Sequence, residues 1–191
     1  IGDYRISTDQ PTAIWKPENS QKFRMTKEQR AEIEELRRQA EVKSAEKYSQ
    51  AAQRSQSIWE QCEEVQKHAY LEKKQVLSYG LRKDKHDNLV IPLKDKQGSI
   101  VGLQFIAADG SKRFLTGSKK SGSFFLLGRE IFNSSDSLNY AEGYATAASI
   151  YADRSQPVVV AFDAYNLIKV AEVMYQYFPK HKHVFVADND D

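Results

Sequence analysis

Changes in the spacing of hydrophobic and polar positions divide this chain of 191 residues into four stretches. Residues 1–25 mix apolar residues with prolines, which favours an arm or a short hairpin. Residues 26–67 contain neither Pro nor Gly and are dominated by Glu, Lys, Arg, Gln and Ala, a composition that predicts one long charged helix. Its apolar residues become dense only near Ile58, Trp59 and Cys62, so we expect the helix to contact another domain or chain there.

The sequence predicts where the long helix starts but leaves open what the helix packs against. Thr26 and Gln29 form a capping-box pattern, with Thr26 as N-cap. A helix of about 40 residues would be about 60 Å long. It therefore projects from the core, bends back as a hairpin near Ser44–Ser57, or packs on another chain. Its charges alternate in sign, which is typical of a solvated face; an arm that binds nucleic acid is the alternative.

Residues 68–136 form a mixed stretch with one short helix and four β-like runs. The helix is predicted over residues 69–76. A Lys-Asp-Lys-Gln-Gly turn separates the first two runs, and a Gly-Ser-Lys-Lys-Ser-Gly loop joins the last two, so we expect each pair to be an antiparallel hairpin. The four runs are 89–93, 100–106, 113–116 and 124–127.

Residues 137–191 alternate strands with helices. Three strands joined by two helical crossovers predict a parallel sheet with helices on its faces. The predicted strands are 137–141, 158–162 and 183–187, and the predicted helices are 145–152 and 166–177. The expected fold class is α/β, with this parallel sheet preceded by an antiparallel β unit and a long N-terminal charged helix.

Composition excludes several classes of protein. The 28 Lys and Arg residues nearly balance the 26 Asp and Glu residues, so the net charge of +2 indicates no partner by itself. Cys62 is the single cysteine, which excludes an internal disulfide and a four-cysteine zinc site and favours a reducing compartment. No apolar run approaches the roughly 20 residues that span a bilayer. We expect a cytoplasmic protein without a membrane partner, and because residue 1 is Ile, a piece of a longer one.

Acidic side chains follow each of the three predicted parallel strands. Glu142 follows the first, Asp163 the second, and Asp188 and Asp190 the third. The carboxyl ends of parallel strands meet at one sheet edge, where open α/β sheets bind ligands. Carboxylates gathered there suit Mg²⁺ or Mn²⁺, which take oxygen ligands and often share them with phosphates. Alternatively these acids only cap helices and turns, and for Asp163 the cap and the ligand are equally favoured.

The acidic pattern resembles that of the TOPRIM domain, a metal-binding module of bacterial-type primases, topoisomerases and some nucleases. That domain has a Glu-Gly after its first strand and an Asp-x-Asp after its third, matched here by Glu142-Gly143 and by Asp188-Asn189-Asp190. Upstream segments are similar to primase-like proteins of plasmids, phages and integrative elements. These segments are AYLEKKQVLSYGLR, LVIPLKDKQGSIVGLQFI, GSKRFLTGSKKSGSFFLLG and AEGYATAASIY. The resemblance covers roughly residues 68–191.

The resemblance implies a set of site residues. Metal binding and catalysis would use Glu142, Asp188 and Asp190. Asp163 is a further candidate ligand from its place after a strand, not from the resemblance. A basic groove would hold nucleotide or nucleic-acid phosphates; Arg and Lys beside Gly-rich turns suit that task chemically. Its candidate residues are Lys112, Arg113, Lys119, Lys120, Arg82 and Lys74. For the loop with Lys119 and Lys120, a merely solvated hairpin loop is the alternative.

Two departures from the family pattern bear on activity. Replicative primases have an Asp four residues after the TOPRIM Glu, and Thr146 stands there in this chain. The chain also ends at Asp191, directly after the Asp-x-Asp, so we expect the TOPRIM part to be C-terminally incomplete. We expect four parts: from composition, an arm (1–25) and the charged helix (26–67), and from the resemblance, a basic α+β subdomain (68–136) and a TOPRIM subdomain (137–191).

The resemblance implies a primase-type nucleotidyltransferase that makes short RNA primers on single-stranded DNA during replication or transfer of a plasmid, phage or mobile element. Its cofactor would be Mg²⁺ or Mn²⁺. Its partners would be the DNA template, ribonucleoside triphosphates, and a helicase or another replication or conjugation protein. The alternatives are a catalytically weak or inactive TOPRIM module that binds single-stranded nucleic acid or partner proteins, and a TOPRIM nuclease.

Overall fold

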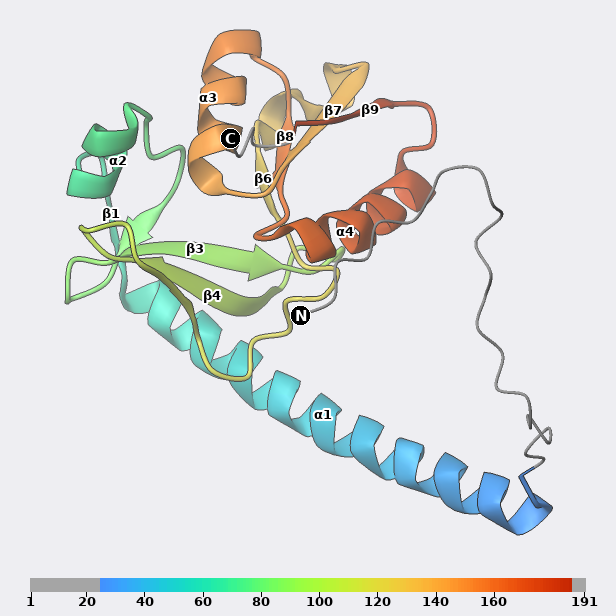
Figure 1. The fold of residues 1–191 in the computed structure, drawn as a ribbon. Helices are drawn as coiled ribbons and strands as arrows, with labels where there is room; N and C mark the ends of the chain where they lie inside the picture. Colours follow the sequence, from blue (N-terminus) through green and yellow to red (C-terminus); the bar gives the residue numbers. More distant parts are fainter. Residues whose placement is uncertain (1–24, 187–191) are drawn as a thin grey trace, which may run out of the picture. The chain divides into compact units, whose positions relative to one another are not determined.

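The computed structural model describes residues 25–186 (Figure 1). The predicted N-terminal arm, residues 1–25, therefore lies almost wholly outside the described residues, and so do Asp188 and Asp190. The chain divides into two units, residues 1–41 and 42–191. No helix among the described residues is long and apolar enough to cross a membrane.

Helix α1 (Lys27–Gln61) is continuous, so the hairpin bend near Ser44–Ser57 does not occur. It starts at the predicted capping box: the Thr26 N–H donates to Gln29 Oε1 (3.0 Å) and the Gln29 N–H donates to Thr26 Oγ1 (3.2 Å). The predicted extension to residue 67 is wrong. The chain leaves the helix after Gln61 because residues 63–64 pair with a strand as β1, and this pairing overrides their helix propensity.

The C-terminal turns of α1 pack on a sheet of their own unit. Ile58 and Trp59 lie against a buried cluster that includes Cys62, Val90 and Phe105. Farther back along the helix, the Arg54 guanidinium donates to the Thr116 carbonyl (2.8 Å). Ile58, Trp59 and Cys62 thus contact the sheet that follows in the same unit, and the predicted contact with another domain or chain stays a prediction.

That sheet has five antiparallel strands in sequence order, β1-β2-β3-β4-β5. The predicted hairpin is its centre: β3 and β4 pair from Leu89↔Ile106 to Lys94↔Ile100. Helix α2 (Ala69–Lys74) connects β1 to β2. The strand bounds are β1 (Glu63–Glu64), β2 (Arg82–Lys83), β3 (Leu89–Lys94), β4 (Ile100–Ile106) and β5 (Lys112–Phe114).

The second sheet has four strands in the order β6-β8-β7-β9. Strand β7 is parallel to both β8 and β9, and β6 is antiparallel to β8. Short helix η1 (Arg129–Ser134) links β6 to β7. The other elements are β6 (Phe125–Leu127), β7 (Ser137–Ala141), α3 (Tyr144–Arg154), β8 (Val158–Val160), α4 (Ala164–Tyr177) and β9 (Lys182–Phe185). The mixed α/β class is confirmed.

Helices α3 and α4 cover opposite faces of this sheet, as Figure 1 shows. Successive strand residues point to opposite faces. In β8, Val158 and Val160 pack with α3, whereas Val159 packs with Val170 and Met174 of α4. The α3 side continues into the five-stranded sheet, because Leu89, Ile91, Leu93 and Ile106 belong to the same buried cluster. The two sheets of residues 42–186 therefore share one core.

The predicted hairpin between residues 113–116 and 124–127 is wrong. Strand β5 pairs with β4, and β6 pairs with β8 in the other sheet. The Gly-Ser-Lys-Lys-Ser-Gly loop thus connects two sheets instead of closing a hairpin. Its conformation is fixed by a distant residue: the Asn166 side chain accepts from the Gly122 N–H (2.7 Å) and donates to the Ser123 carbonyl (2.9 Å).

Candidate functional site

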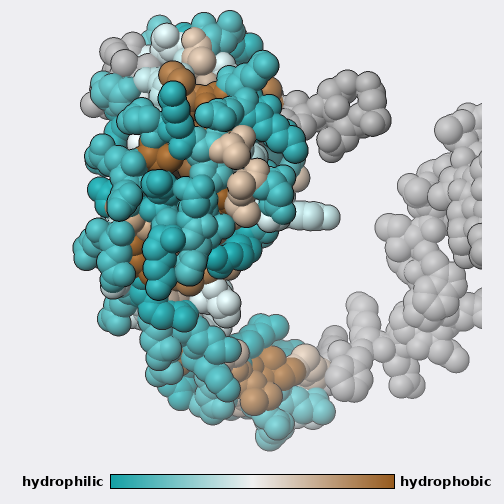
Figure 2. All heavy atoms as spheres, turned by 90° about the vertical axis from the view of Figure 1, so that its left-hand side faces the viewer, coloured by the Kyte–Doolittle hydropathy of each residue, from teal (hydrophilic) through white to brown (hydrophobic). Residues whose placement is uncertain are grey.

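A cavity of about 290 Å³ lies where α2, β5 and the start of α3 meet. We call it the lysine cavity, because Lys73 and Lys74 of α2 and Lys112 of β5 line it. The turn that follows Glu142 forms another wall. The full lining is Tyr70, Lys73, Lys74, Asp109, Gly110, Lys112, Gly143, Ala145 and Thr146. Figure 2 views the side of the molecule on which α2 lies, and hydrophilic side chains cover most of it.

The turn from β7 into α3 brings Glu142 to the carboxyl end of the central strand. Gly143 is the N-cap of α3 and has no side chain with which to cap it. An ideal Cβ on Gly143 would lie 3.7 Å from Nζ of Lys112, so the ammonium group lies against the backbone of this turn. A helix N-terminus and an adjacent ammonium group both favour an anion such as phosphate.

The charge of the lysine cavity is positive, with three lysines against Asp109. The Asp109 carboxylate accepts a hydrogen bond from the Ser111 N–H (2.8 Å), and its hydrogen bonds to Ser111 hold its pKa below the usual value. The Asp109 carboxylate therefore stabilises the turn in which it lies, and within residues 25–186 it forms no ion pair with a lysine of the cavity. Each lysine can donate charge-assisted hydrogen bonds to phosphate oxygens, which are about twice as strong as neutral ones.

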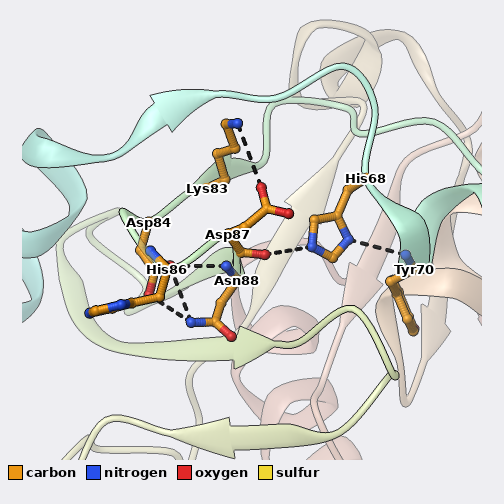
Figure 3. Close-up of polar contacts among 7 residues, drawn as sticks. All are labelled: His68, Tyr70, Lys83, Asp84, His86, Asp87 and Asn88. Atoms are coloured by element: carbon orange, nitrogen blue, oxygen red, sulfur yellow. Dashed lines mark hydrogen bonds and ion pairs between the residues drawn. The ribbon is translucent and has the colours of Figure 1, made fainter.

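A buried histidine fixes the helix that supplies two of the lysines (Figure 3). His68 is the N-cap of α2: its Nδ1 accepts from the Tyr70 N–H (3.1 Å), and its Nε2 lies 2.7 Å from the Asp87 carbonyl, to which it donates. This arrangement requires the neutral ring protonated on Nε2. The Asp87 turn is itself tied by Asp84, which accepts from the Asn88 N–H (2.9 Å). His68 thus positions Tyr70 and the α2 lysines.

Two of the predicted phosphate-binding residues lie on the other face of the five-stranded sheet. Arg113 follows Lys112 in β5, so its side chain points away, and its guanidinium lies over the Phe105 ring at 4.3 Å from the centroid. Arg82 donates to the Trp59 carbonyl (2.8 Å) and lies over the Trp59 ring at 4.6 Å. Neither residue lines the lysine cavity; both contact the face on which α1 packs.

The lysines of the Gly-Ser-Lys-Lys-Ser-Gly loop have different surroundings. Lys120 forms an ion pair with Asp163 and lies over the Phe114 ring at 5.3 Å. Lys119 is exposed. The loop thus lies at the carboxyl end of β8, where Asp163 follows, and neither lysine lines the lysine cavity.

Asp163 acts as the N-cap of α4, one of the two roles expected for it. Its carboxylate accepts from the Asn166 N–H (2.7 Å) and pairs with Lys120. Partial burial on its own raises the pKa of Asp163, but hydrogen bonds from Lys120 and Asn166 and the Lys120 charge outweigh it, so the pKa lies below the usual value. Its oxygens are therefore occupied by protein donors.

The acidic cluster predicted at the sheet edge is described only in part. Glu142 is half-buried and forms no ion pair within residues 25–186. Strand β9 pairs with β7 as far as Phe185↔Tyr140, and the Val186 N–H donates to the Tyr140 carbonyl (2.9 Å). Asp188 and Asp190 follow outside the described residues. Among the described ones, no group of three or more His, Cys, Asp or Glu side chains is arranged to hold a metal.

Sequence reasoning did not single out Lys73 or His68. The sequence could have indicated Lys73, since the run Tyr-Leu-Glu-Lys-Lys places two lysines in the last turn of a short helix. The indication for His68 is weaker: it precedes the helix at the N-cap position, but His is not among the usual capping residues.

Comparisons with known proteins agree with the predicted resemblance. A protein of Escherichia coli named DNA primase TraC is 39% identical to this chain over 102 residues, which are 53% of this chain and 10% of that protein. The resemblance to primases is thus confirmed over about half of the chain, and the match spans about a tenth of the length of this curated relative. The chain matches no protein-family profile.

Two solved structures share the fold. The primase fragment of the bacteriophage T7 primase-helicase protein superposes with a TM-score of 0.51 and 23% identity, covering 63% of this chain and 54% of that one. T7 primase domains bound to an RNA/DNA hybrid and dTTP, solved with the T7 lagging-strand DNA polymerase, give a TM-score of 0.50 and 22% identity, covering 65% and 60%. At this identity the likeness concerns the fold alone. Over the matched residues, the chain is similar to primases in sequence and in fold.

Proposed function

We propose that this chain is the catalytic core of a primase that synthesises short RNA primers on single-stranded DNA, in the replication or transfer of a plasmid, phage or other mobile element. The observation that carries the proposal is the lysine cavity at the N-terminus of α3, with Lys112 against the turn that follows Glu142. Sequence similarity to DNA primase TraC and the shared fold with the T7 primase fragment support the same function.

In this proposal, residues 137–191 are a TOPRIM subdomain and residues 68–136 a basic subdomain. Three parallel strands joined through α3 and α4 support the first assignment. The second is supported by the position of α2 and β5, which bring their lysines to the start of α3. The lysine cavity is thus built from both subdomains.

Glu142, Asp188 and Asp190 are the proposed ligands of Mg²⁺ or Mn²⁺. Their donor chemistry fits, because all three offer carboxylate oxygens and Glu142 has no protein cation as a partner within residues 25–186. The β7–β9 pairing supports a shared position, since β9, which Asp188 and Asp190 follow in the sequence, pairs with the strand that Glu142 follows. Such an ion, when bound, would neutralise charge that develops on the phosphates. We do not assign Asp163 as a ligand, because its oxygens accept hydrogen bonds from Asn166 and Lys120.

The chain's own residues would act by positioning. The ammonium groups of Lys73, Lys74 and Lys112 would bind the phosphate oxygens of a ribonucleoside triphosphate, and the N–H groups at the start of α3 would add donors. Phosphoryl transfer needs little covalent help from protein, so alignment of the reacting groups and charge neutralisation account for the catalysis. The single-stranded template would pass over the same basic surface, and a helicase or other replication protein remains a proposed partner.

The second candidate function is a catalytically weak module that binds single-stranded nucleic acid. It is favoured by Thr146, which lines the lysine cavity where replicative primases have an acid. A hydroxyl group at this place supplies no negative charge for a metal ion. This candidate predicts salt-dependent DNA binding without primer synthesis.

Primer synthesis tests the proposal. Purified protein is incubated with Mn²⁺, labelled ribonucleotides and single-stranded DNA, and products are resolved on a gel. We expect short RNA products, which Glu142→Gln abolishes. Glu172→Gln, a matched change at an exposed position of α4, leaves the yield unchanged. Wild-type yield from the Glu142→Gln variant would refute the metal assignment, and binding without product would favour the second candidate.

A further inference from the structure

A second cavity, of about 350 Å³, lies between the β3–β4 turn, β6, η1 and α4. We call it the α4 cavity. In Figure 1 this region lies where the end of β3 approaches α4. It shares no lining residue with the lysine cavity, so the proposed primase chemistry does not account for it.

The interior of the α4 cavity is apolar. Phe124, Phe132, Met174 and Phe178 line it, and the Phe132 and Phe178 rings meet edge to face with centroids 4.4 Å apart. Methionine and aromatic side chains provide a polarizable surface that adapts to an inserted apolar group. The volume is enough for one or two large side chains.

Cationic groups surround this apolar interior. Lys94 and Arg129 both line the cavity, and Lys96 lies over the Tyr177 ring at 5.7 Å from the centroid. Lys94 is half-buried, and this burial together with the neighbouring Arg129 charge lowers its pKa. Two like charges thus lie in one partly desolvated cavity.

The acid that lines the same cavity does not neutralise these cations. The Asp95 carboxylate accepts from the Gln97 N–H (3.0 Å) and the Ser99 N–H (2.9 Å) of its own turn. Within residues 25–186, neither Lys94 nor Arg129 forms an ion pair. The α4 cavity is therefore suited to a ligand that places an anionic group at its rim and an apolar group in its interior.

This combination separates two classes of ligand. A nucleobase has several hydrogen-bonding groups along its edge, and the apolar interior offers them no side-chain partners. Burying these groups there would cost their desolvation free energy, and no new hydrogen bond would offset that cost. A leucine or phenylalanine side chain has no hydrogen bonds to water that it would lose on entering the cavity. Carboxylates beside it would meet Lys94 and Arg129. We propose that the α4 cavity binds a short acidic peptide segment of a partner protein, with a large apolar side chain inserted between β6 and α4.

A methionine side chain in the α4 cavity can report on peptide binding. The chain has two methionines, Met25 and Met174, and Met174 lines the α4 cavity. Protein labelled with ¹³C in the methionine methyl groups gives two signals that can be followed by NMR. On addition of the peptide acetyl-EEDLF-amide, we expect the Met174 signal to shift saturably and the Met25 signal to stay in place. The neutral peptide acetyl-QQNLF-amide should shift Met174 only at much higher concentration.

A charge reversal at the exposed rim tests the ionic part without disturbing the core. Arg129→Glu should weaken peptide binding by roughly tenfold or more, the loss of one charge-assisted hydrogen bond. Arg154→Glu, the same change at the exposed end of α3, should leave binding unchanged. An unmoved Met174 signal, equal binding of the neutral peptide, or a Met174 shift caused by oligodeoxythymidine but not by the peptide would each overturn the proposal. None of these results depends on primer synthesis.

Discussion

Asn166 ties the loop that carries Lys120 to the four-stranded sheet, and its replacement by alanine gives a strong test of the fold. The side chain is buried. Its Oδ1 accepts from the Gly122 N–H (2.7 Å), and its Nδ2 donates to the carbonyls of Ser123 (2.9 Å) and Ala161 (2.7 Å). Asn166→Ala removes all three bonds and leaves three backbone groups without these partners.

The expected decrease in the free energy of unfolding follows from those three hydrogen bonds. A hydrogen bond inside a protein contributes about 1 kcal/mol net, and a buried group left unsatisfied costs about 1–3 kcal/mol. Asn166→Ala should therefore lower the free energy of unfolding by about 3 kcal/mol. For a domain of this size, such a loss corresponds to a decrease in Tm of roughly 6–12 °C.

Urea unfolding followed by circular dichroism measures this change. The matched control is Gln56→Ala, which removes one exposed side-chain hydrogen bond on α1, to Glu60, and should change stability by less than about 0.5 kcal/mol. If Asn166→Ala costs less than about 1 kcal/mol, these three hydrogen bonds do not hold the loop.

Three further predictions concern the site. Lys112→Ala should weaken binding of ribonucleoside triphosphate roughly tenfold, measured by calorimetry, because one charge-assisted hydrogen bond is lost; Lys85→Ala, an exposed control, should not. His68→Ala should lower the free energy of unfolding by about 1 kcal/mol or more, because α2 loses its cap, and an unchanged urea midpoint would contradict this role. The pKa of Asp163 is lowered, so its contribution to stability is present above the ordinary value of 3.8 and lost as pH falls through the folded value. Asp163→Asn keeps the cap, and its deficit relative to wild type should shrink from about pH 6 to below 3.8; a constant deficit would refute the Lys120 pairing.

Sequence reasoning succeeded where a local pattern decides the structure. The capping box of Thr26 and Gln29, the strand at 100–106 and the strand at 137–141 appear as expected, because each depends on residues within a few positions of one another. The crossovers followed from the alternation of apolar runs and helices. Glu142 is at a strand end for the same reason.

Other features depend on distant partners, which one sequence does not reveal. The run at 124–127 was assigned to its neighbour along the chain, but its partner is β8, more than 30 residues later, and Asn166 fixes the turn between them. The end of α1 depends on pairing with β2. Arg113 was grouped with Lys112 because they are adjacent, yet strand alternation sends the two side chains to opposite faces. The roles of Asp188 and Asp190 remain proposals that rest on register and resemblance.

Metal binding and primer synthesis, measured on the same samples, test whether Glu142 and Asp188 hold the catalytic metal ion. Mn²⁺ binding is followed by electron paramagnetic resonance, and RNA products are counted on a single-stranded template. Wild type should bind Mn²⁺ and make primers, and Glu142→Gln and Asp188→Asn should each lose both. Primer synthesis at wild-type yield in either variant, or Mn²⁺ binding unaffected by both changes, would contradict this metal assignment.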